Sequence, residues 1–457
     1  MNLGVIAMRN IDLIVAEIGS TTTVVDAFDD MGGASPVFIG QGYAPTSVLD
    51  GDVTIGLERA VSMLESRLGD RIKWGRMMAS SSAAGGLKMT VHGLVYDMTA
   101  KAAKEAALGA GAVLHMVTAG NLNSGDLNKI REIRPNIILL AGGVDYGERD
   151  TVINNAREIA NMHMDTPVIY AGNIAAADEI RAIFQGANPV IFVDNVYPRI
   201  DELNIEPTRR VIQDVFEEHI IKAPGMEKIR TMVTGRITPT PGAVMNAAKL
   251  LKEDMGELMV LDVGGATTDV HSVTQDSDEI ARILIAPEPE AKRTVEGDLG
   301  VYINRYHVLD CIGAEEAEKA LSMDVRRVID TLPPIPVSDE EIRLAEFLTE
   351  VACKTAVARH TGEIKYLYGP TGRYTMAMGK DLTRVKWIIG TGGALTRLPH
   401  GREILEGLCS ETKGKKLLPT ADAQVLIDND YIMAAAGVMS ADFPEASLSL
   451  MKKSFGI

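Results

Sequence analysis

The chain has 457 residues, 46% hydrophobic, 24% charged and 5% aromatic, which indicates a folded globular protein too long for a single hydrophobic core. Its formal net charge of −16 argues against a surface that follows nucleic-acid phosphates, because such a surface needs clustered lysine and arginine. The N-terminus lacks the apolar core of a signal peptide, and no apolar run reaches the ~20 residues of a membrane span. These features predict a cytoplasmic protein.

The first predicted element is a β-hairpin over residues 11–28, where two apolar runs flank a small, hydroxyl-rich turn. Its tip holds Gly19, Ser20, Thr21 and Thr22. Residues 51–69 then place apolar side chains at helical spacing, which predicts a helix that ends at Gly69. The chain therefore begins as an α/β protein.

Residues 76–220 alternate short apolar runs with amphipathic helices, which predicts an inserted, parallel, Rossmann-like subdomain. The clearest strands are 136–143, 167–173 and 190–195, and the expected helices are 97–108, 149–162, 175–185 and 207–220. Ligands of open parallel sheets bind beyond the carboxyl ends of the strands. Ordinary turn chemistry explains the small and polar residues there equally well, namely Gly142, Gly143, Asp145, Asn173 and Asp194.

A second α/β unit begins near residue 231, where a Gly/Pro-rich turn leads into a helix with a face of small residues. It continues with a strand over 258–265, a helical region after Ser338, a strand over 387–393 and a closing helix within 428–440. We therefore expect a three-part organisation: 1–75 and 231–457 as two lobes, with 76–230 as the inserted subdomain.

Two segments, 14–25 and 259–270, share one design: an apolar strand containing an acid, then glycine and hydroxyl residues, then a return strand. A tip with little side-chain bulk lets backbone N–H groups approach phosphate oxygens, and threonine or serine hydroxyls add donors. The acids, Glu17 and Asp262, suit a hydrated Mg²⁺, which prefers one or two carboxylates together with water and phosphate. One such hairpin alone is equally consistent with a tight structural turn.

A third glycine-rich segment, WIIGTGGALT (387–396), follows an apolar strand. Its glycines are expected to admit a purine and ribose close to the backbone, with Thr391 as a polar contact. Its spacing is not that of a dinucleotide fingerprint. The order of the three segments is the informative feature.

This order resembles the actin, sugar kinase and heat-shock chaperone ATPase superfamily, whose five parts correspond to 14–25, 239–251, 259–270, 387–396 and 429–440. The resemblance implies two duplicated ribonuclease H-like lobes that bind ATP and Mg²⁺. The first hairpin carries Glu17 where the superfamily usually has aspartate, a departure that puts the role of this acid at the metal in question. The implied nucleotide-binding residues are Gly19, Ser20, Thr21, Thr22, Gly264, Gly265, Thr267, Thr268, Gly390, Thr391, Gly392 and Gly393.

A closer resemblance, over essentially the full chain, is to the glutamate mutase accessory proteins of the MutL/GlmL type. The stretches that carry it include VAEIGSTTT, ASSSAAGGLKMTVHGLV, ILLAGGVDYGERD, VTGRITPTPGAVMNAA, LDVGGATTDVHSV and KRTVEGDLGV. The resemblance implies an ATP-dependent reactivating chaperone that exchanges damaged cobalamin in an adenosylcobalamin-dependent mutase. The client is then glutamate mutase or a related aminomutase.

Two features near the second hairpin leave alternatives open. Asp269 either orients the attacking water or caps a turn. The stretch 292–300, with Lys292, Arg293, Glu296 and Asp298, either senses the γ-phosphate or forms a solvated loop. The expected activity is a slow ATPase, because the site offers positioning and charge rather than a strong base.

Three rival functions share this fold. A small-molecule kinase would need a base, for which Asp269 is the candidate. An actin-like structural protein would polymerise with nucleotide. An activator of radical dehydratases would bridge a cluster through paired cysteines, which the wide spacing of Cys311, Cys353 and Cys409 does not favour.

Overall fold

The computed structural model describes residues 8–19, 21–47, 51–82, 87–220, 224–369, 372–409 and 415–457. The chain forms two compact units. The first comprises Met1–Val244 and Gly437–Ala446, and the second comprises Met245–Ala436 and Ser447–Ile457. Ser20, one of the predicted nucleotide-binding residues, lies outside the described residues. The division at 75 and 230 stays a prediction.

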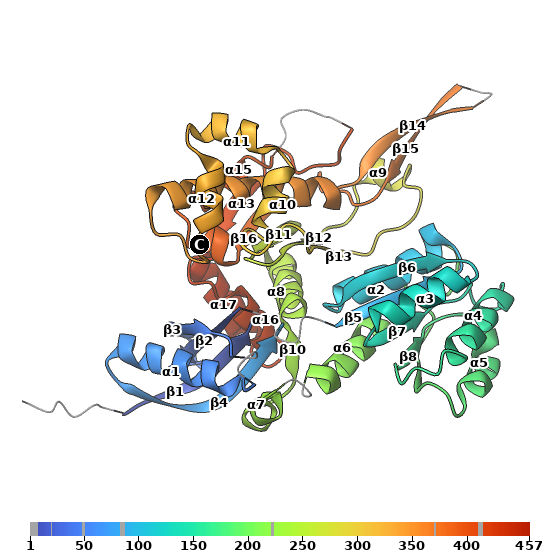
Figure 1. Cartoon of the computed structure of the whole chain (residues 1–457), viewed down its shortest axis with the longest axis horizontal. Coiled ribbons are helices and arrows are strands. Elements are labelled where there is room, and N and C mark those ends of the chain that lie inside the picture. The colour runs from blue at the N-terminus through green and yellow to red at the C-terminus, as the bar shows by residue number, and fades with distance from the viewer. Residues whose placement is uncertain are drawn as a thin grey trace, which may run out of the picture. The chain divides into compact units, whose positions relative to one another are not determined.

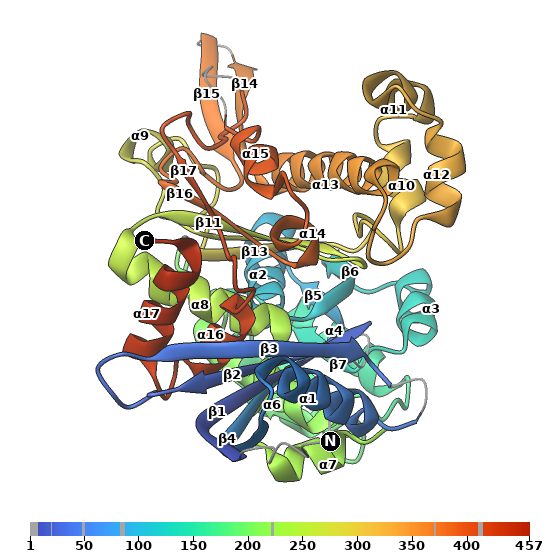
Figure 2. The same cartoon turned by 90° about the vertical axis from the view of Figure 1, so that its left-hand side faces the viewer.

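The first unit contains a five-stranded sheet in the order β10-β4-β1-β2-β3. Its strands are β1 (Met8–Ile18), β2 (Thr22–Asp29), β3 (Val37–Pro45), β4 (Arg71–Ser81) and β10 (Ile237–Pro239). The pairs β1–β2 and β2–β3 are antiparallel, whereas β1–β4 and β4–β10 are parallel. Helix α1 (Thr54–Leu68) joins β3 to β4 and ends at Gly69, as predicted (Figure 2). It approaches β3 closely because Gly42 has no side chain: a Cβ there would lie 2.1 Å from the carbonyl oxygen of Ala60.

The second unit repeats this order and these directions in the sheet β13-β12-β11-β16-β17. Its strands are β11 (Leu258–Val263), β12 (Thr268–Val273), β13 (Ala291–Glu296), β16 (Trp387–Thr391) and β17 (Gln424–Ile427). Again the first three strands in sequence pair antiparallel and the last two add in parallel. Two sheets with the same strand order and the same directions are the duplicated ribonuclease H-like lobes of an actin-like ATPase fold, as expected from the sequence.

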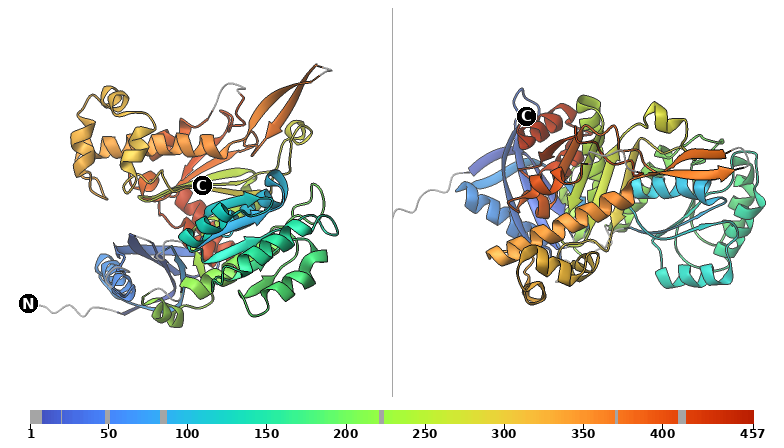
Figure 3. Two further views of the ribbon diagram at one scale, coloured as in Figure 1. Left: turned by 45° about the vertical axis from the view of Figure 1, so that its right-hand side comes forward. Right: turned by 90° about the horizontal axis from the view of Figure 1, so that it is seen from above.

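The inserted subdomain lies in sequence between β4 and β10, within the first unit. Its sheet, in the order β6-β5-β7-β8-β9, is parallel throughout, and helices pack along it (Figure 3). This is the strand order of a doubly wound fold. The strands are β5 (Lys88–Gly93), β6 (Val113–Ala119), β7 (Ile137–Leu140), β8 (Val168–Tyr170) and β9 (Val190–Phe192), and the main helices are α2 (Lys101–Gly109), α3 (Ser124–Ile133), α4 (Asp150–Ala160), α5 (Ala177–Phe184) and α6 (Glu206–Ile220). The predicted helices and strands of this region are confirmed.

Helix α13 (Asp339–His360) packs on one face of the β11–β13 sheet. It begins with a capping box between Ser338 and Glu341, and its last residue, His360, bonds to Ser272 of β12 and Thr294 of β13. A two-stranded ribbon, β14 (Glu363–Gly369) with β15 (Gly372–Met378), extends away from the rest of this unit (Figure 1).

The remaining helices include α7 (Met226–Met232), α8 (Thr240–Met255), α9 (Asp278–Ala281), α10 (Arg305–Asp310), α11 (Ala314–Leu321), α12 (Val325–Thr331), α14 (Gly393–Thr396), α15 (Gly401–Glu406), α16 (Met433–Met439) and α17 (Pro444–Phe455). Across the described part of the chain, none of the helices combines the length and the apolar character needed to cross a membrane.

Candidate functional site

The second unit brings two predicted acids together. Asp262 on β11 is directly opposite Asp269 on β12, and on its other side it is the ladder partner of Thr391 on β16. Residues directly opposite each other in a sheet share a face. The second hairpin and the glycine-rich turn after β16 are therefore neighbours, as the order of the motifs predicted.

The three glycines of this turn have different surroundings. Gly392 has φ +85°, and a Cβ there would lie 2.6 Å from a carboxylate oxygen of Asp262, so the turn touches the acid. A Cβ at Gly390 would lie 2.6 Å from the side chain of Leu405, so this glycine lets α15 pack on the strand. Gly393 is exposed, and a Cβ there would have no neighbouring atom within 4 Å, so this glycine is accessible to a ligand.

The hydroxyl of Thr391 is used inside the protein, because it donates to Asp428 at 3.0 Å. Asp428 is fully buried and also accepts from the backbone N–H groups of Ile432 and Met433 and from the hydroxyl of Ser454. Burial raises the pKa of Asp428, and these hydrogen bonds oppose the rise. Asp428 was not among the residues predicted from the sequence. It directly follows β17 and precedes α16 by five residues, so an aspartate between an apolar run and the closing helix is the signal that could have found it.

Asp269 is held by an ion pair with Arg293 of β13. The guanidinium Nε and Nη2 lie 3.1 and 2.7 Å from Oδ1 of Asp269, and the two side chains are only 2% and 8% exposed. The hydroxyl of Thr267 donates to the other oxygen at 3.3 Å. The neighbouring Lys292 contacts different residues, with its Nζ 2.7 and 2.8 Å from two oxygens of Thr274.

Asp262 has an unusual electrostatic environment. Burial, followed by the nearby Asp269, raises its pKa to about 7, while Arg293 acts in the opposite direction. A bound cation would favour the ionised form. No group of three or more potential metal-ligating residues occurs among the described residues. Mg²⁺ does not need three protein ligands when phosphates and water complete its shell, so a carboxylate beside a glycine-rich turn fits this ion.

The two hairpins share a hydrogen bond at the tip: the N–H of Gly19 donates to the Thr22 carbonyl, and that of Gly264 donates to the Thr267 carbonyl, each at 3.0 Å. They differ in their acids. Glu17 corresponds to Asp262, but its ladder partner is Val24. Val24 thus stands where the second hairpin has Asp269. The acid pair therefore occurs in the second hairpin alone.

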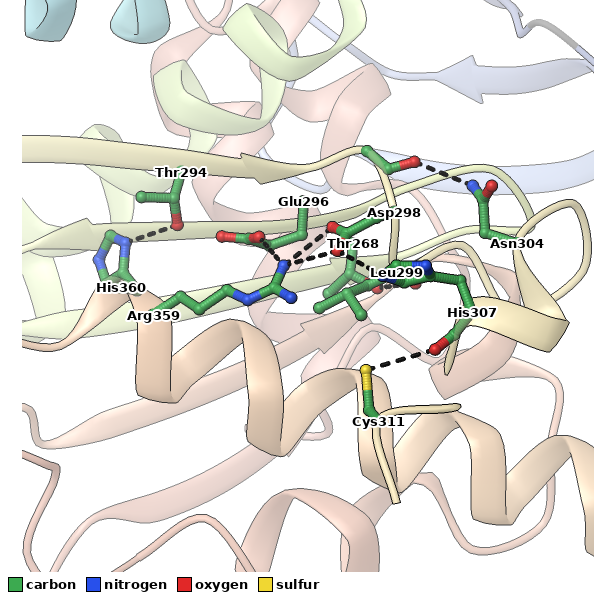
Figure 4. Close-up of polar contacts among 11 residues, drawn as sticks. Thr268, Thr294, Glu296, Asp298, Leu299, Asn304, His307, Cys311, Arg359 and His360 are labelled. Atoms are coloured by element: carbon green, nitrogen blue, oxygen red, sulfur yellow. Dashed lines mark hydrogen bonds and ion pairs between the residues drawn. The ribbon is translucent and has the colours of Figure 1, made fainter. Parts of the chain in front are cut away.

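The predicted hydroxyl donors also differ. Thr21 and Thr22 are exposed and Thr267 is partly exposed. Thr268 is buried, and its hydroxyl donates to the carbonyl oxygen of Leu299 at 2.7 Å (Figure 4). Thr268 thus fixes the segment that follows β13.

Glu296, at the end of β13, and Asp298, in the segment that follows, form ion pairs with an arginine side chain. Arg359 on α13 donates to Glu296 at 2.5 Å and to both oxygens of Asp298 at 2.9 and 3.0 Å (Figure 4). His307 lies 3.1 Å from Asp298. The pKa of Asp298 is lowered, chiefly by Arg359.

The polar residues at the carboxyl ends of the inserted strands mainly bond to one another. Asn173 accepts from the N–H groups of Tyr146 and Ala175, and Asn195 donates to the carbonyl of Gly143 and to Asp145. Ordinary turn chemistry accounts for these bonds. Asp194 is exposed.

Comparison with known proteins gives a match over most of the chain. A family model described as MutL protein matches residues 13–455. Protein MutL of Clostridium tetanomorphum is 35% identical to the chain, over 96% of this chain and 98% of that protein.

Similar solved structures have low sequence identity. They include a diol dehydratase-reactivating factor in nucleotide-free form (10% identity, 95% of this chain and 100% of that chain, TM-score 0.38) and nucleotide-free acetone carboxylase (12%, 94% and 70%, TM-score 0.41). A third is a ligand-bound xylulose kinase from Lactobacillus acidophilus (11%, 98% and 92%, TM-score 0.31). The fold assignment rests on the strand order and directions described above.

Proposed function

The chain belongs to the MutL family, and from this premise we propose that it is an ATP-dependent accessory protein that reactivates an adenosylcobalamin-dependent mutase. The client in this proposal is glutamate mutase or a related aminomutase. The observation that carries the nucleotide part of the proposal is the meeting of Asp262, Asp269 and the Gly392 turn at the tip of the second hairpin.

In the proposed site, Asp262 faces Mg²⁺, the hairpin tip contacts phosphate oxygens, and the open backbone at Gly393 lies against the adenosine. The metal would neutralise charge that develops on the phosphates during transfer. Asp269, fixed by Arg293, orients a water molecule for attack on the γ-phosphorus. The bond to the leaving oxygen of ADP then breaks, and the water proton leaves with the phosphate product.

Turnover at such a site is slow. A carboxylate paired with a buried guanidinium is a weak base, so catalysis depends on positioning and charge rather than on proton abstraction. The same pairing disfavours the kinase alternative, in which Asp269 would have to accept the proton of a substrate hydroxyl. Slow hydrolysis suits a protein that acts through a change of conformation and not through the ADP and phosphate that it releases.

The proposed reactivation follows from differential binding. A nucleotide shifts a conformational equilibrium only by as much as its affinity differs between the two states. Loss of the γ-phosphate removes contacts made with ATP alone, and the chain then changes its grip on the mutase. The mutase releases cobalamin that has lost its adenosyl group and binds an intact coenzyme.

The test uses a mutase inactivated with hydroxocobalamin, starting with glutamate mutase and then an aminomutase. We expect activity to return only when the chain, MgATP and fresh adenosylcobalamin are all present, and repeated rounds to fail with a non-hydrolysable ATP analogue. A mutase preparation without the chain is the control. Equal recovery with and without ATP would contradict the proposal.

A further inference from the structure

The segment 297–304, here called the strap, lies against the tip of the second hairpin and bonds to its carbonyl groups one after another. The N–H of Val301 donates to the carbonyl of Gly264 at 3.2 Å. The N–H groups of Tyr302 and Ile303 donate to that of Gly265 at 3.0 and 2.7 Å.

The last carbonyl of the tip is held by a side chain. The amide nitrogen of Asn304 lies 2.9 Å from the carbonyl oxygen of Ala266 and 2.9 Å from that of Gly297. The strap approaches so closely that a Cβ at Gly300 would lie 2.2 Å from the carbonyl carbon of Ala266.

These bonds determine where the N–H groups of the tip point. In a trans peptide the C=O and the following N–H point in opposite directions. With the carbonyls of residues 264–266 bound to the strap, the N–H groups of Gly265, Ala266 and Thr267 point away from it. Within the part of the chain that the structure describes, these three N–H groups donate no hydrogen bond. Successive N–H groups that point the same way form an anion-binding concavity.

The position of Asn304 in the chain would lead one to expect its side chain to cap a helix. It is the N-cap residue of α10, and asparagine is among the best N-caps, yet its side chain makes no capping hydrogen bond. The amide reaches back to the hairpin tip instead. The strap itself is anchored at its start, where Arg359 pairs with Asp298.

The first hairpin is held in a similar way by a different residue. The hydroxyl of Thr46 donates to the carbonyl of Gly19, and its N–H donates to that of Thr21, each at 2.9 Å. A clamp on the tip carbonyls thus occurs in both units. This recurrence supports a role in the orientation of the tip rather than a local accident of packing.

We propose that Asn304 is a positioning residue: by holding the Ala266 carbonyl it presents the N–H of Thr267, together with those of Gly265 and Ala266, to the phosphates of the nucleotide. This inference rests on the proposed ATP site and adds the element that preorganises it. Asn304 itself makes no contact with the phosphates.

The test compares full-length wild type with Asn304→Ala and Asn304→Ser, by titration calorimetry with MgATP, MgADP and adenosine. Loss of an oriented N–H donor to a charged phosphate should weaken ATP and ADP binding by about 10- to 100-fold in both variants. Adenosine affinity should stay unchanged. Serine is a good N-cap but cannot reach both carbonyls, so it separates the two roles.

Three results would overturn the proposal. Unchanged ATP affinity in both variants would remove the positioning role and leave the ATP site intact. Restoration by serine alone would show that Asn304 acts as a helix cap. Failure of the wild type to bind ATP or ADP would overturn the ATP site and, with it, this inference. Thermal unfolding of each variant identifies any affinity loss that comes from partial unfolding.

Discussion

Asp262→Asn is expected to abolish magnesium-dependent ATP binding and to stabilise the ligand-free chain at the same time. The amide is a poor ligand for Mg²⁺, so we expect ATP affinity in magnesium and the rate of hydrolysis to fall by about 100-fold or more. The opposite effect on stability follows from the raised pKa of Asp262, since the ionised carboxylate is disfavoured in the folded chain without a cation.

The effect of Asp262 on stability depends on pH. Between pH 3.8 and about 7 the unfolded chain loses this proton whereas the folded chain keeps it. The folded state then binds more protons, so its stability falls as pH rises through that window, and the full penalty is present above pH 7. Allowing for solvent screening, we expect about 2 kcal/mol at pH 8. The stability gap between Asp262→Asn and wild type should therefore vanish near pH 4.

Denaturant unfolding of the ligand-free proteins at pH 5, 6, 7 and 8 measures this gap, and titration with ATP in magnesium or EDTA measures the binding. Glu17→Gln is the matched variant for the first hairpin: if Glu17 acts on the same metal, it weakens magnesium-dependent binding as well. An Asp262→Asn protein that hydrolyses ATP at the wild-type rate would refute the site.

Arg293→Met is expected to cause the largest loss of stability. It leaves the buried Asp269 carboxylate without its guanidinium partner and close to Asp262. Removing one member of a buried ion pair typically lowers the free energy of unfolding by about 3–5 kcal/mol. Replacing both members, with Asp269→Leu added, should recover most of the loss, because no buried charge is left unpaired.

Lys292→Met provides the control on the same strand. Lys292 is as buried as Arg293, but its Nζ donates hydrogen bonds to two neutral oxygens of Thr274, and burial lowers its pKa. Its replacement by methionine should lower stability much less. Chemical denaturation of the four proteins gives the comparison. A double variant no more stable than Arg293→Met would show that the ion pair is not the source of the loss.

Much of the fold could be predicted because its signals are local. The acid, glycine and hydroxyl residues of each hairpin are contiguous in sequence, and so is the alternation of strands and helices in the inserted subdomain. The β14–β15 ribbon also has a local signal, because residues that alternate in character flank the sequence GPTG (369–372), whose glycine and proline are typical of turns. Its strands were not predicted.

The remaining features of the site depend on contacts between distant residues. Nothing in the sequence around Thr391 indicates that its hydroxyl bonds to Asp428 rather than to a ligand. The pairing of Asp269 with Arg293 depends on the register of β12 and β13, which short-range patterns do not specify. The contact of Asn304 with Ala266 joins a helix cap to a hairpin tip through tertiary packing.

In the proposed function, the bound nucleotide changes the affinity of the chain for a mutase. The most direct test is the affinity of the chain for a hydroxocobalamin-inactivated mutase, measured by surface plasmon resonance with MgATP, with MgADP and without nucleotide. We expect the affinities for the mutase in MgATP and in MgADP to differ by about 5- to 150-fold, the usual range of allosteric coupling. Equal affinities in all three conditions would contradict it, because a ligand that binds both states equally shifts neither.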